Sequence, residues 1–316
     1  MKEVDKEDKI FFKDITTFKI GGPISFFREV KNEIELKKVL GEFIKRGISF
    51  FVLGGGSNIL APDEEFRKAV LRILGREINI KGESVEVFSG TPLLSLVNFY
   101  NDNNFSGLEW AIGIPGTVGG AVRGNAGAFG RSIGDLVKSV KLLRIKNGRM
   151  DELEFRKEEC NFSYRESIFR KEKEFIIEKV VLSFERKEKE KIEEKMKEFF
   201  SYRKEHQPLT FPSAGSVFKN FQGEIKNKKL LNKFPQLDDF NKKKIIPAGF
   251  LIEKSGLKGL KKGRVMISRK HANFIINLGD GNAKDVLYLV KLIKDKVKEN
   301  FDIDLEEEIE ILRDFS

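Results

Sequence analysis

The chain has 316 residues, 40% of them hydrophobic and 34% charged, and Lys plus Arg outnumber Asp plus Glu by 59 to 49. A chain of this length can bury a sizeable core and is expected to form two or three domains. Its single cysteine excludes an internal disulfide and a thiolate cluster, and its two well separated histidines make a metal site unexpected. The net charge of +10 indicates attraction to polyanions, either nucleic acid or ligands that carry diphosphates.

The sequence predicts no membrane partner. No apolar run reaches the roughly 18 residues that a membrane helix needs. The first ten residues alternate charges instead of forming a secretory apolar segment. We therefore expect a soluble, cytoplasmic protein.

The first elements predict a β-α-β unit. Residues 24–30 are typical of a strand, and residues 48–53 of a buried strand. Between them, apolar residues recur at the spacing of an amphipathic helix: Leu36, Val39, Leu40, Phe43 and Ile44. The second strand leads directly into the glycine-rich sequence GGGSN at residues 54–58.

This GGGSN loop differs from the two common phosphate-binding fingerprints. It has no Gly-Lys-Ser/Thr, as a Walker loop would, and the residues after it do not open a helix, as a dinucleotide turn would require. The loop therefore indicates some other diphosphate-binding fold.

A second glycine-rich run, GIPGTVGGAVRGNAGAFG, spans residues 113–130. Glycine lets the main chain enter left-handed conformations and approach another surface closely, and exposed N–H groups can line an anion-binding nest. Taken alone, such a run is as often a flexible loop. Two of them in one domain favour a single large ligand held at two places.

Further along, residues 137–145 and 174–184 are typical of strands that bracket Arg165. Taken locally, this arginine is either a surface ion pair or a fixed cation that faces a carboxylate. Residues 185–201 predict a charged helix between domains, whose dense mixed charge favours solvated ion pairs over nucleic-acid binding.

The C-terminal part is again punctuated by glycine. The Ala-Gly-Ser sequence before an apolar stretch can present the hydroxyl of Ser216, and residues 247–255 predict a helix. Asn282 is a favourable N-cap for the last long helix, with Asp285 at its third position. The chain closes on an acidic strand over residues 304–312.

Seven motifs in this order resemble the UDP-N-acetylenolpyruvoylglucosamine reductase family, flavoenzymes of peptidoglycan synthesis. The motifs are TTFKIGGP, LGGGSN, GIPGTVGGAVRGNAGAFG, FSYRESIF, SAGSVFKN, AGFLIEKSGLKG and KHANFIINLGDGNAKDV. The resemblance runs from about Phe12 to Leu312. Each motif is weak alone, but all seven in order are specific.

The resemblance implies an α+β fold: a two-subdomain, vanillyl-alcohol-oxidase-type (PCMH-like) FAD domain followed by a C-terminal α/β substrate domain. The implied boundaries are 1–186 for the FAD domain, with subdomains of about 1–68 and 69–186. Residues 187–203 then form the connecting helix, and residues 204–316 form the substrate-binding domain.

The resemblance also implies a non-covalent FAD cofactor and NADPH as co-substrate, with a hydride passing by way of flavin N5 to C3 of an enolpyruvyl ether of a UDP-sugar. The residues that match the family's cofactor motifs are Gly54, Gly55, Gly56, Ser57, Asn58, Pro115, Gly116, Gly119, Gly120, Asn125 and Gly127.

By the same resemblance, Arg165, Ser216 and Glu308 are the catalytic residues. A guanidinium suits the substrate carboxylate, Ser216 would give a proton to C2, and Glu308 would stabilise the enolate-like intermediate or direct the proton relay. The implied substrate-binding residues are Lys219, Asn220, His206 and His271.

The chain resembles the shorter, second type of the family, because no inserted loop separates Ile168 from Glu178. We expect a monomer. Two alternatives are another FAD oxidoreductase on the same scaffold and a basic nucleic-acid-binding protein. The latter would be colourless and would bind with a steep salt dependence.

Overall fold

The computed structural model describes residues 9–313, and internal contacts divide the chain into two compact units. The first unit contains Ile24–Gly56 and Phe66–Glu205, with the described residues up to Ile10. The second unit contains Phe11–Pro23, Ser57–Glu65 and the chain from His206 onward. Two short segments that the linear boundaries assign to the N-terminal domain thus group with the C-terminal unit.

Hydrogen bonds explain this grouping. The Asn277 side-chain amide donates to the carbonyl oxygens of Phe18 and Lys19, at 3.1 Å each. Asp63 Oδ1 accepts from the backbone N–H of Ala283 at 2.8 Å. Buried backbone groups need partners, and those of the two short segments find them in the C-terminal half of the chain.

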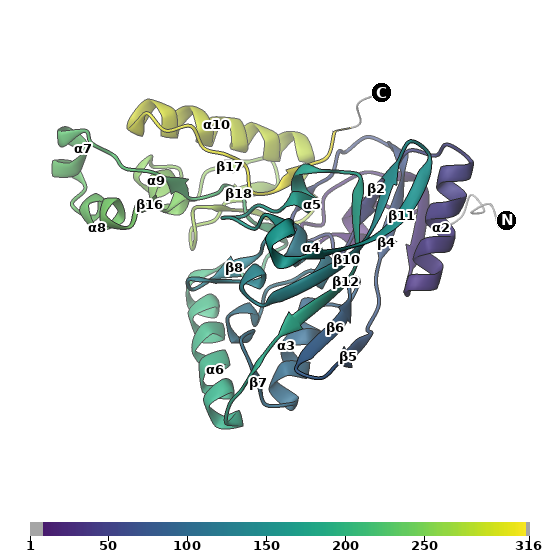
Figure 1. The fold of residues 1–316 in the computed structure, drawn as a ribbon. Coiled ribbons are helices and arrows are strands. Elements are labelled where there is room, and N and C mark those ends of the chain that lie inside the picture. The colour runs from purple at the N-terminus through teal and green to yellow at the C-terminus, as the bar shows by residue number, and fades with distance from the viewer. Residues whose placement is uncertain (1–8, 314–316) are drawn as a thin grey trace. The chain divides into compact units, whose positions relative to one another are not determined.

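The first unit begins with the predicted β-α-β elements: β1 (Ile24–Val30), α2 (Glu33–Lys45) and β2 (Phe50–Leu53). The two strands are not neighbours, because β4 (Phe66–Ile73) lies between them and pairs with both in parallel. In Figure 1, α2 runs beside this sheet. The GGGSN loop leaves the end of β2, as predicted.

An antiparallel five-stranded sheet forms the rest of the core of this unit, in the order β11-β10-β12-β6-β5. Its strands are β5 (Ile78–Ile80), β6 (Ser84–Phe88), β10 (Val137–Lys146), β11 (Arg149–Arg156) and β12 (Phe175–Ser183). The helices α3 (Leu93–Asp102) and α4 (Val118–Arg123) contribute buried side chains to the same hydrophobic cluster as β6, β10 and β12. The glycine-rich run is therefore anchored on a packed core.

The charged helix is α6 (Lys189–His206), and it belongs to the first unit. Its outer face carries ion pairs such as Lys191 with Glu188 at 2.8 Å, as its mixed charge predicted. Its inner stripe has helical spacing and consists of Ile192, Met196, Phe199 and Arg203.

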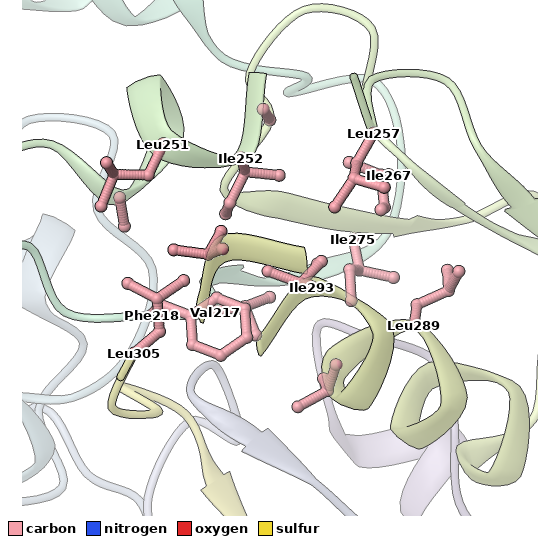
Figure 2. Close-up of a cluster of buried hydrophobic side chains, with 14 of the residues drawn as sticks. Val217, Phe218, Leu251, Ile252, Leu257, Ile267, Ile275, Leu289, Ile293 and Leu305 are labelled. Carbon is pink, nitrogen blue, oxygen red and sulfur yellow. The ribbon is translucent and has the colours of Figure 1, made fainter. Parts of the chain in front are cut away.

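The second unit is built on a four-stranded antiparallel sheet in the order β14-β19-β18-β17. The strands are β14 (Ser213–Ser216), β17 (Lys261–Lys262), β18 (Val265–Ile267) and β19 (Phe274–Asn277). The helices α9 (Ala248–Lys254) and α10 (Ala283–Phe301) pack on it, and Figure 2 shows Ile252, Ile275 and Ile293 within the shared core. Asn282 caps α10 as predicted, accepting from the N–H of Asp285 at 2.8 Å.

The acidic C-terminal stretch forms less strand than predicted. Only β20 (Glu310–Ile311) is a strand, and it pairs in parallel with β3 (Ile59–Leu60). The preceding residues make single bonds to another segment: the N–H of Lys219 donates to the carbonyl of Glu306, and that of Glu308 to the carbonyl of Val217.

The remaining elements are short. They are α1 (Phe12–Ile15), β7 (Phe105–Ser106), β8 (Gly127–Ala128), β9 (Arg131–Ser132), α5 (Ile168–Lys171), β13 (Glu185–Arg186), β15 (Phe221–Gln222), α7 (Lys228–Lys233), α8 (Gln236–Lys243) and β16 (Ile245–Ile246). Among the helices of residues 9–313, none combines the length and the apolar character needed to cross a bilayer.

Candidate active site

The two glycine-rich loops meet in the first unit. A Cβ added to Gly55 would lie 2.7 Å from Gly116 Cα, and one added to Gly54 would lie 2.5 Å from the hydroxyl oxygen of Thr117. Neither distance is possible for a real Cβ, so both positions require glycine. The two main chains therefore touch with no side chain between them.

Other glycines of the central run are also fixed by close packing. A Cβ on Gly119 would lie 2.7 Å from Ser89 Cβ, and one on Gly127 would lie 2.5 Å from the carbonyl oxygen of Arg131. Gly120 has room for a Cβ, and its N–H instead donates to Thr117 Oγ1 at 3.3 Å at the start of α4. Gly116 itself has φ +117°, which L side chains rarely adopt.

These loops fit an FAD diphosphate. Two bare backbones held together offer N–H groups without side chains in the way, which suits a group of two linked phosphates. The residues that would hold the cofactor are the predicted set in the loops around Gly54–Ser57 and Pro115–Gly120. Their shape is set by packing on the protein itself.

Asn125 connects the glycine run to the turn that carries Arg165. Its side chain is 7% exposed; the amide donates to the carbonyl of Ser163 at 2.7 Å and accepts from the N–H of Gly134 at 3.1 Å. The amide of Asn125 is thus engaged within the protein, although the motif assigns the residue to the cofactor.

Arg165 lies in a tight turn. The backbones of Ser163 and Glu166 exchange two hydrogen bonds of 3.1 Å, and Arg165 between them has φ +57°. The fully buried Ser167 then donates to the carbonyl of Arg123 at 2.6 Å, at the end of α4. Both sides of the turn are therefore hydrogen-bonded to the glycine run, which fixes the main chain at Arg165.

Ser216 ends strand β14 in the second unit, after Gly215 with φ +81°. The next residue, Val217, donates its N–H to the carbonyl of Asn273 at 2.8 Å. Asn273 is 3% exposed, and its side chain both accepts from the N–H of Phe218 and donates to its carbonyl, at 3.0 and 2.8 Å. This pair of bonds fixes the main chain on the C-terminal side of Ser216.

Glu308 is brought to the same place. Its N–H donates to the carbonyl of Val217 at 2.8 Å, and Phe218 forms a bridge with Glu307. On the other side, the Asn58 amide donates to the carbonyl of Glu308 at 3.1 Å. The structure therefore places Ser216 and Glu308 on adjoining segments, with the last residue of the GGGSN loop bonded to the same strand.

The predicted substrate residues also belong to the second unit. Lys219 Nζ lies 3.5 Å from a Glu306 carboxylate oxygen, and Asn220 Oδ1 accepts from the N–H of Ala248 at 3.1 Å. The His271 ring lies next to Gly249, where a Cβ would come within 3.2 Å of Cε1. Asn220 and His271 thus both lie beside the start of α9.

The pKa of His271 is lowered from its usual range. Burial is the main cause, followed by the positive charge of Lys258; the exposed His206 also lowers it, and Glu253 opposes them. His271 Nδ1 accepts from the N–H of Asn273 at 3.2 Å, which requires an unprotonated nitrogen there.

The predicted site residues fall into two groups. Arg165 lies in the first unit with the glycine run, whereas Ser216, Glu308 and the four substrate residues lie in the second. Sequence reasoning missed the residues that hold these groups, namely Thr117, Asn273 and the buried Arg203. Only Arg203 carried a signal, as the one charged residue in the inner stripe of α6.

Comparison with known proteins defines the class. Residues 24–154 match the model of an FAD binding domain. Residues 207–312 match the model of the UDP-N-acetylenolpyruvoylglucosamine reductase C-terminal domain. The first match covers the parallel sheet of the first unit, strands β5, β6 and β10 of the antiparallel sheet, and both glycine loops. The predicted FAD cofactor and the predicted fold class are therefore confirmed.

Whole-chain relatives then give the family. The reductase of that name from a Thermotoga species is 39% identical over 297 residues, covering 94% of this chain and 90% of the relative. That of Carboxydothermus hydrogenoformans is 40% identical over 301 residues, covering 94% and 90%. The crystal structure of the Thermus caldophilus enzyme has 35% identity and a TM-score of 0.75, covering 97% and 98%. The chain belongs to the UDP-N-acetylenolpyruvoylglucosamine reductase family, and is an FAD-dependent oxidoreductase, as the sequence predicted.

The contact between the glycine loops can be tested by Gly55→Ala. The added methyl would overlap Gly116 Cα, so the two loops must separate, and we expect purified protein that has lost at least ~90% of its flavin. The visible flavin absorbance per polypeptide measures this. The matched control is Gly41→Ala in α2, where a Cβ meets nothing within 4 Å. Full flavin content in Gly55→Ala would contradict the role given to this contact.

The state of His271 can be tested by the pH dependence of unfolding. Because its folded pKa lies below the unfolded value of ~6.5, the unfolded chain binds the proton more readily. The stability contributed by neutral His271 is complete above that pH and is lost as the pH falls through the lowered folded pKa. His271→Asn keeps an acceptor for the Asn273 N–H but does not titrate. The free energy of unfolding, measured in urea from pH 8 to pH 5, should fall more in wild type than in this variant. The same pH dependence in both proteins would show that the pKa of His271 is not lowered by folding.

Proposed function

We propose that this chain reduces the enolpyruvyl ether of a UDP-sugar, UDP-N-acetylenolpyruvoylglucosamine, to UDP-N-acetylmuramate with NADPH, and that Arg165, Ser216 and Glu308 complete the reaction. The single observation that carries the assignment is family membership over nearly the whole chain. The adjoining backbones of Ser216 and Glu308 support the catalytic roles.

Reduction of the enol ether places a hydride on C3 and a proton on C2. FAD, when bound, supplies the redox chemistry, because it can take two electrons from NADPH and pass them to the enol ether. The chain's own residues bind the cofactor diphosphate, orient the substrate, and manage the negative charge and the proton.

Arg165 is proposed to bind the substrate carboxylate. A guanidinium stays charged at neutral pH and offers paired donors to two carboxylate oxygens. Its turn is tied to the glycine run by Asn125 and Ser167, so the cation is in place before substrate arrives. Negative charge that develops beside the carboxylate during reduction is stabilised by the same cation without rearrangement.

Ser216 is proposed to protonate C2, with Glu308 stabilising the intermediate or directing the proton relay. Proton transfer needs donor and acceptor within hydrogen-bond reach, and the main chain around Ser216 is held by Asn273 on one side and by β19 on the other. The bond from the Glu308 N–H to Val217 keeps the carboxyl-bearing residue in the same neighbourhood.

The substrate's nucleotide part is proposed to contact Lys219, Asn220, His206 and His271. Lys219 brings a positive charge suited to a phosphate. Asn220 accepts from the N–H of Ala248 and His271 from that of Asn273, and these bonds orient both side chains.

We expect the enzyme to act in the cytoplasm as a monomer. Sedimentation of the flavin-loaded protein at micromolar concentration should give one species near the chain mass of 36.2 kDa. A species of twice that mass would overturn the monomer.

The proton role is tested by Ser216→Ala. We expect flavin reduction by NADPH to stay within ~2-fold of wild type, while reoxidation by the enolpyruvyl substrate slows at least ~10²-fold, because only the second half-reaction needs the proton at C2. Anaerobic stopped-flow absorbance follows each half-reaction separately. The control is Ser213→Ala, which removes a hydroxyl from the same strand. Equal slowing of both half-reactions would show that Ser216 is not the donor.

A further inference from the structure

Arg203 is a buried cation on a helix whose other charged side chains are exposed. It is 6% exposed, and it occupies the inner stripe of α6 in register with Ile192, Met196 and Phe199. Arginine is almost never buried to this degree unless it is paired. A function for its charge is therefore expected.

The contacts of Arg203 use only part of its hydrogen-bonding capacity. Its Nη2 donates to the carbonyl of Trp110 at 2.9 Å, and its guanidinium lies 5.3 Å from the centre of the Phe129 ring. A guanidinium has five N–H donors. Its Nε is buried without a hydrogen-bond partner, and within residues 9–313 no carboxylate forms an ion pair with it.

The electrostatic surroundings of Arg203 are unfavourable as they stand. Burial lowers the pKa of its guanidinium, and the positive charge of Arg165 lowers it further. Arginine nevertheless stays protonated in proteins. Removing a charge from water without a counter-charge is costly, so the buried guanidinium of Arg203 favours the arrival of an anion.

The position of Arg203 connects it to the glycine run. Its side chain packs against Gly113 at the start of the run and against Phe129 near the end, where a Cβ on Gly113 would lie 3.4 Å from Arg203 Cδ. Phe129 is 41% exposed and stacks on Phe199 with ring centres 4.4 Å apart. Tyr202 meets the same ring edge-on at 5.4 Å. Aromatic faces beside a cation are suited to a nucleotide, whose ring can stack while its phosphates pair with the charge.

We propose that Arg203 binds the diphosphate of a nucleotide, with its unused donors directed at the phosphate oxygens. This inference rests on the proposed function, because that function supplies the nucleotides. Two sources share the chemistry: the FAD cofactor itself, and the nucleotides that enter and leave, namely the UDP-sugar and NADPH.

A purely structural role would not need the charge. The bond to the Trp110 carbonyl requires one N–H donor, which a glutamine amide also provides, and a neutral side chain avoids the cost of a buried charge. Arg203→Gln therefore separates the two roles, because it keeps a donor for Trp110 and removes the cation. Arg203→Lys keeps the positive charge but loses the planar guanidinium with its paired N–H donors.

The experiment measures two affinities on the flavin-loaded protein. The dissociation constant for FAD is obtained from the fluorescence of FAD released on dilution, and that for UDP from the change it causes in the flavin spectrum. We expect Arg203→Gln to weaken at least one of them about 10- to 100-fold, the range for a lost charge-assisted hydrogen bond. Arg203→Lys should fall between Arg203→Gln and wild type, and the affinity should decrease with added salt in wild type more than in Arg203→Gln.

The arms of the experiment identify the source of the diphosphate. If Arg203→Gln weakens FAD binding and leaves UDP binding unchanged, the diphosphate is that of the cofactor. If it weakens UDP binding and leaves FAD binding unchanged, the diphosphate belongs to the nucleotides that enter and leave. The matched control is Arg28→Met in β1, because Arg28 also donates to a carbonyl, that of Phe27, and lies over a ring, that of Phe26. We expect that variant to change neither constant.

The proposal is overturned if Arg203→Gln leaves both dissociation constants within twofold of wild type, or if Arg203→Lys is as weak as Arg203→Gln. The first result would make Arg203 a structural residue, and the second would deny a role to its charge. Failure of the proposed function has a separate signature. Wild-type protein would then bind flavin but not reduce the enolpyruvyl substrate, and the comparison of FAD affinities among the variants would still hold.

Discussion

Contact between two main chains without intervening side chains is the constraint on which the first unit depends. Gly55 and Gly116 approach so closely that any Cβ on Gly55 would overlap the opposite backbone. This contact joins the loop after β2 to the run before α4, and so joins the parallel sheet to the antiparallel one. The cofactor cradle is therefore a consequence of packing between two sheets, and its N–H groups are placed by the rigid elements on either side.

The same run also holds the turn that carries Arg165. Asn125 and the carbonyl of Arg123 hold the two sides of the turn at Arg165. A cation that must meet substrate charge gains most when it is fixed beforehand, because no ordering is then needed during the reaction. The glycine run thus has two structural roles. Gly116 contacts the GGGSN loop, and Arg123 and Asn125 are hydrogen-bonded to the turn that carries Arg165.

In the second unit, a few hydrogen bonds to the main chain hold the segments that carry Ser216 and Glu308. Asn273 fixes Phe218 through two hydrogen bonds, and Val217 accepts from the N–H of Glu308. The acidic C-terminal stretch is held in place by the bond to Val217 and by Asn58 of the GGGSN loop, whose amide donates to the carbonyl of Glu308. Ser216 and Glu308, for which we propose the proton-transfer roles, consequently lie on adjoining segments, although they are far apart in the sequence.

The sequence by itself determined the glycine loops, the first strands and helix, the last long helix and the family. Each of these follows from the spacing of apolar residues along the chain or from motifs of adjacent residues. Tertiary structure alone decided that β4 separates β1 from β2, that residues 57–65 group with the C-terminal half, and that the Asn125 amide serves Ser163, 38 residues away. It also decided that the charge of Arg203 is buried. Hydrogen bonds and burial between distant segments depend on how the chain returns on itself, and residue spacing along the chain does not record that.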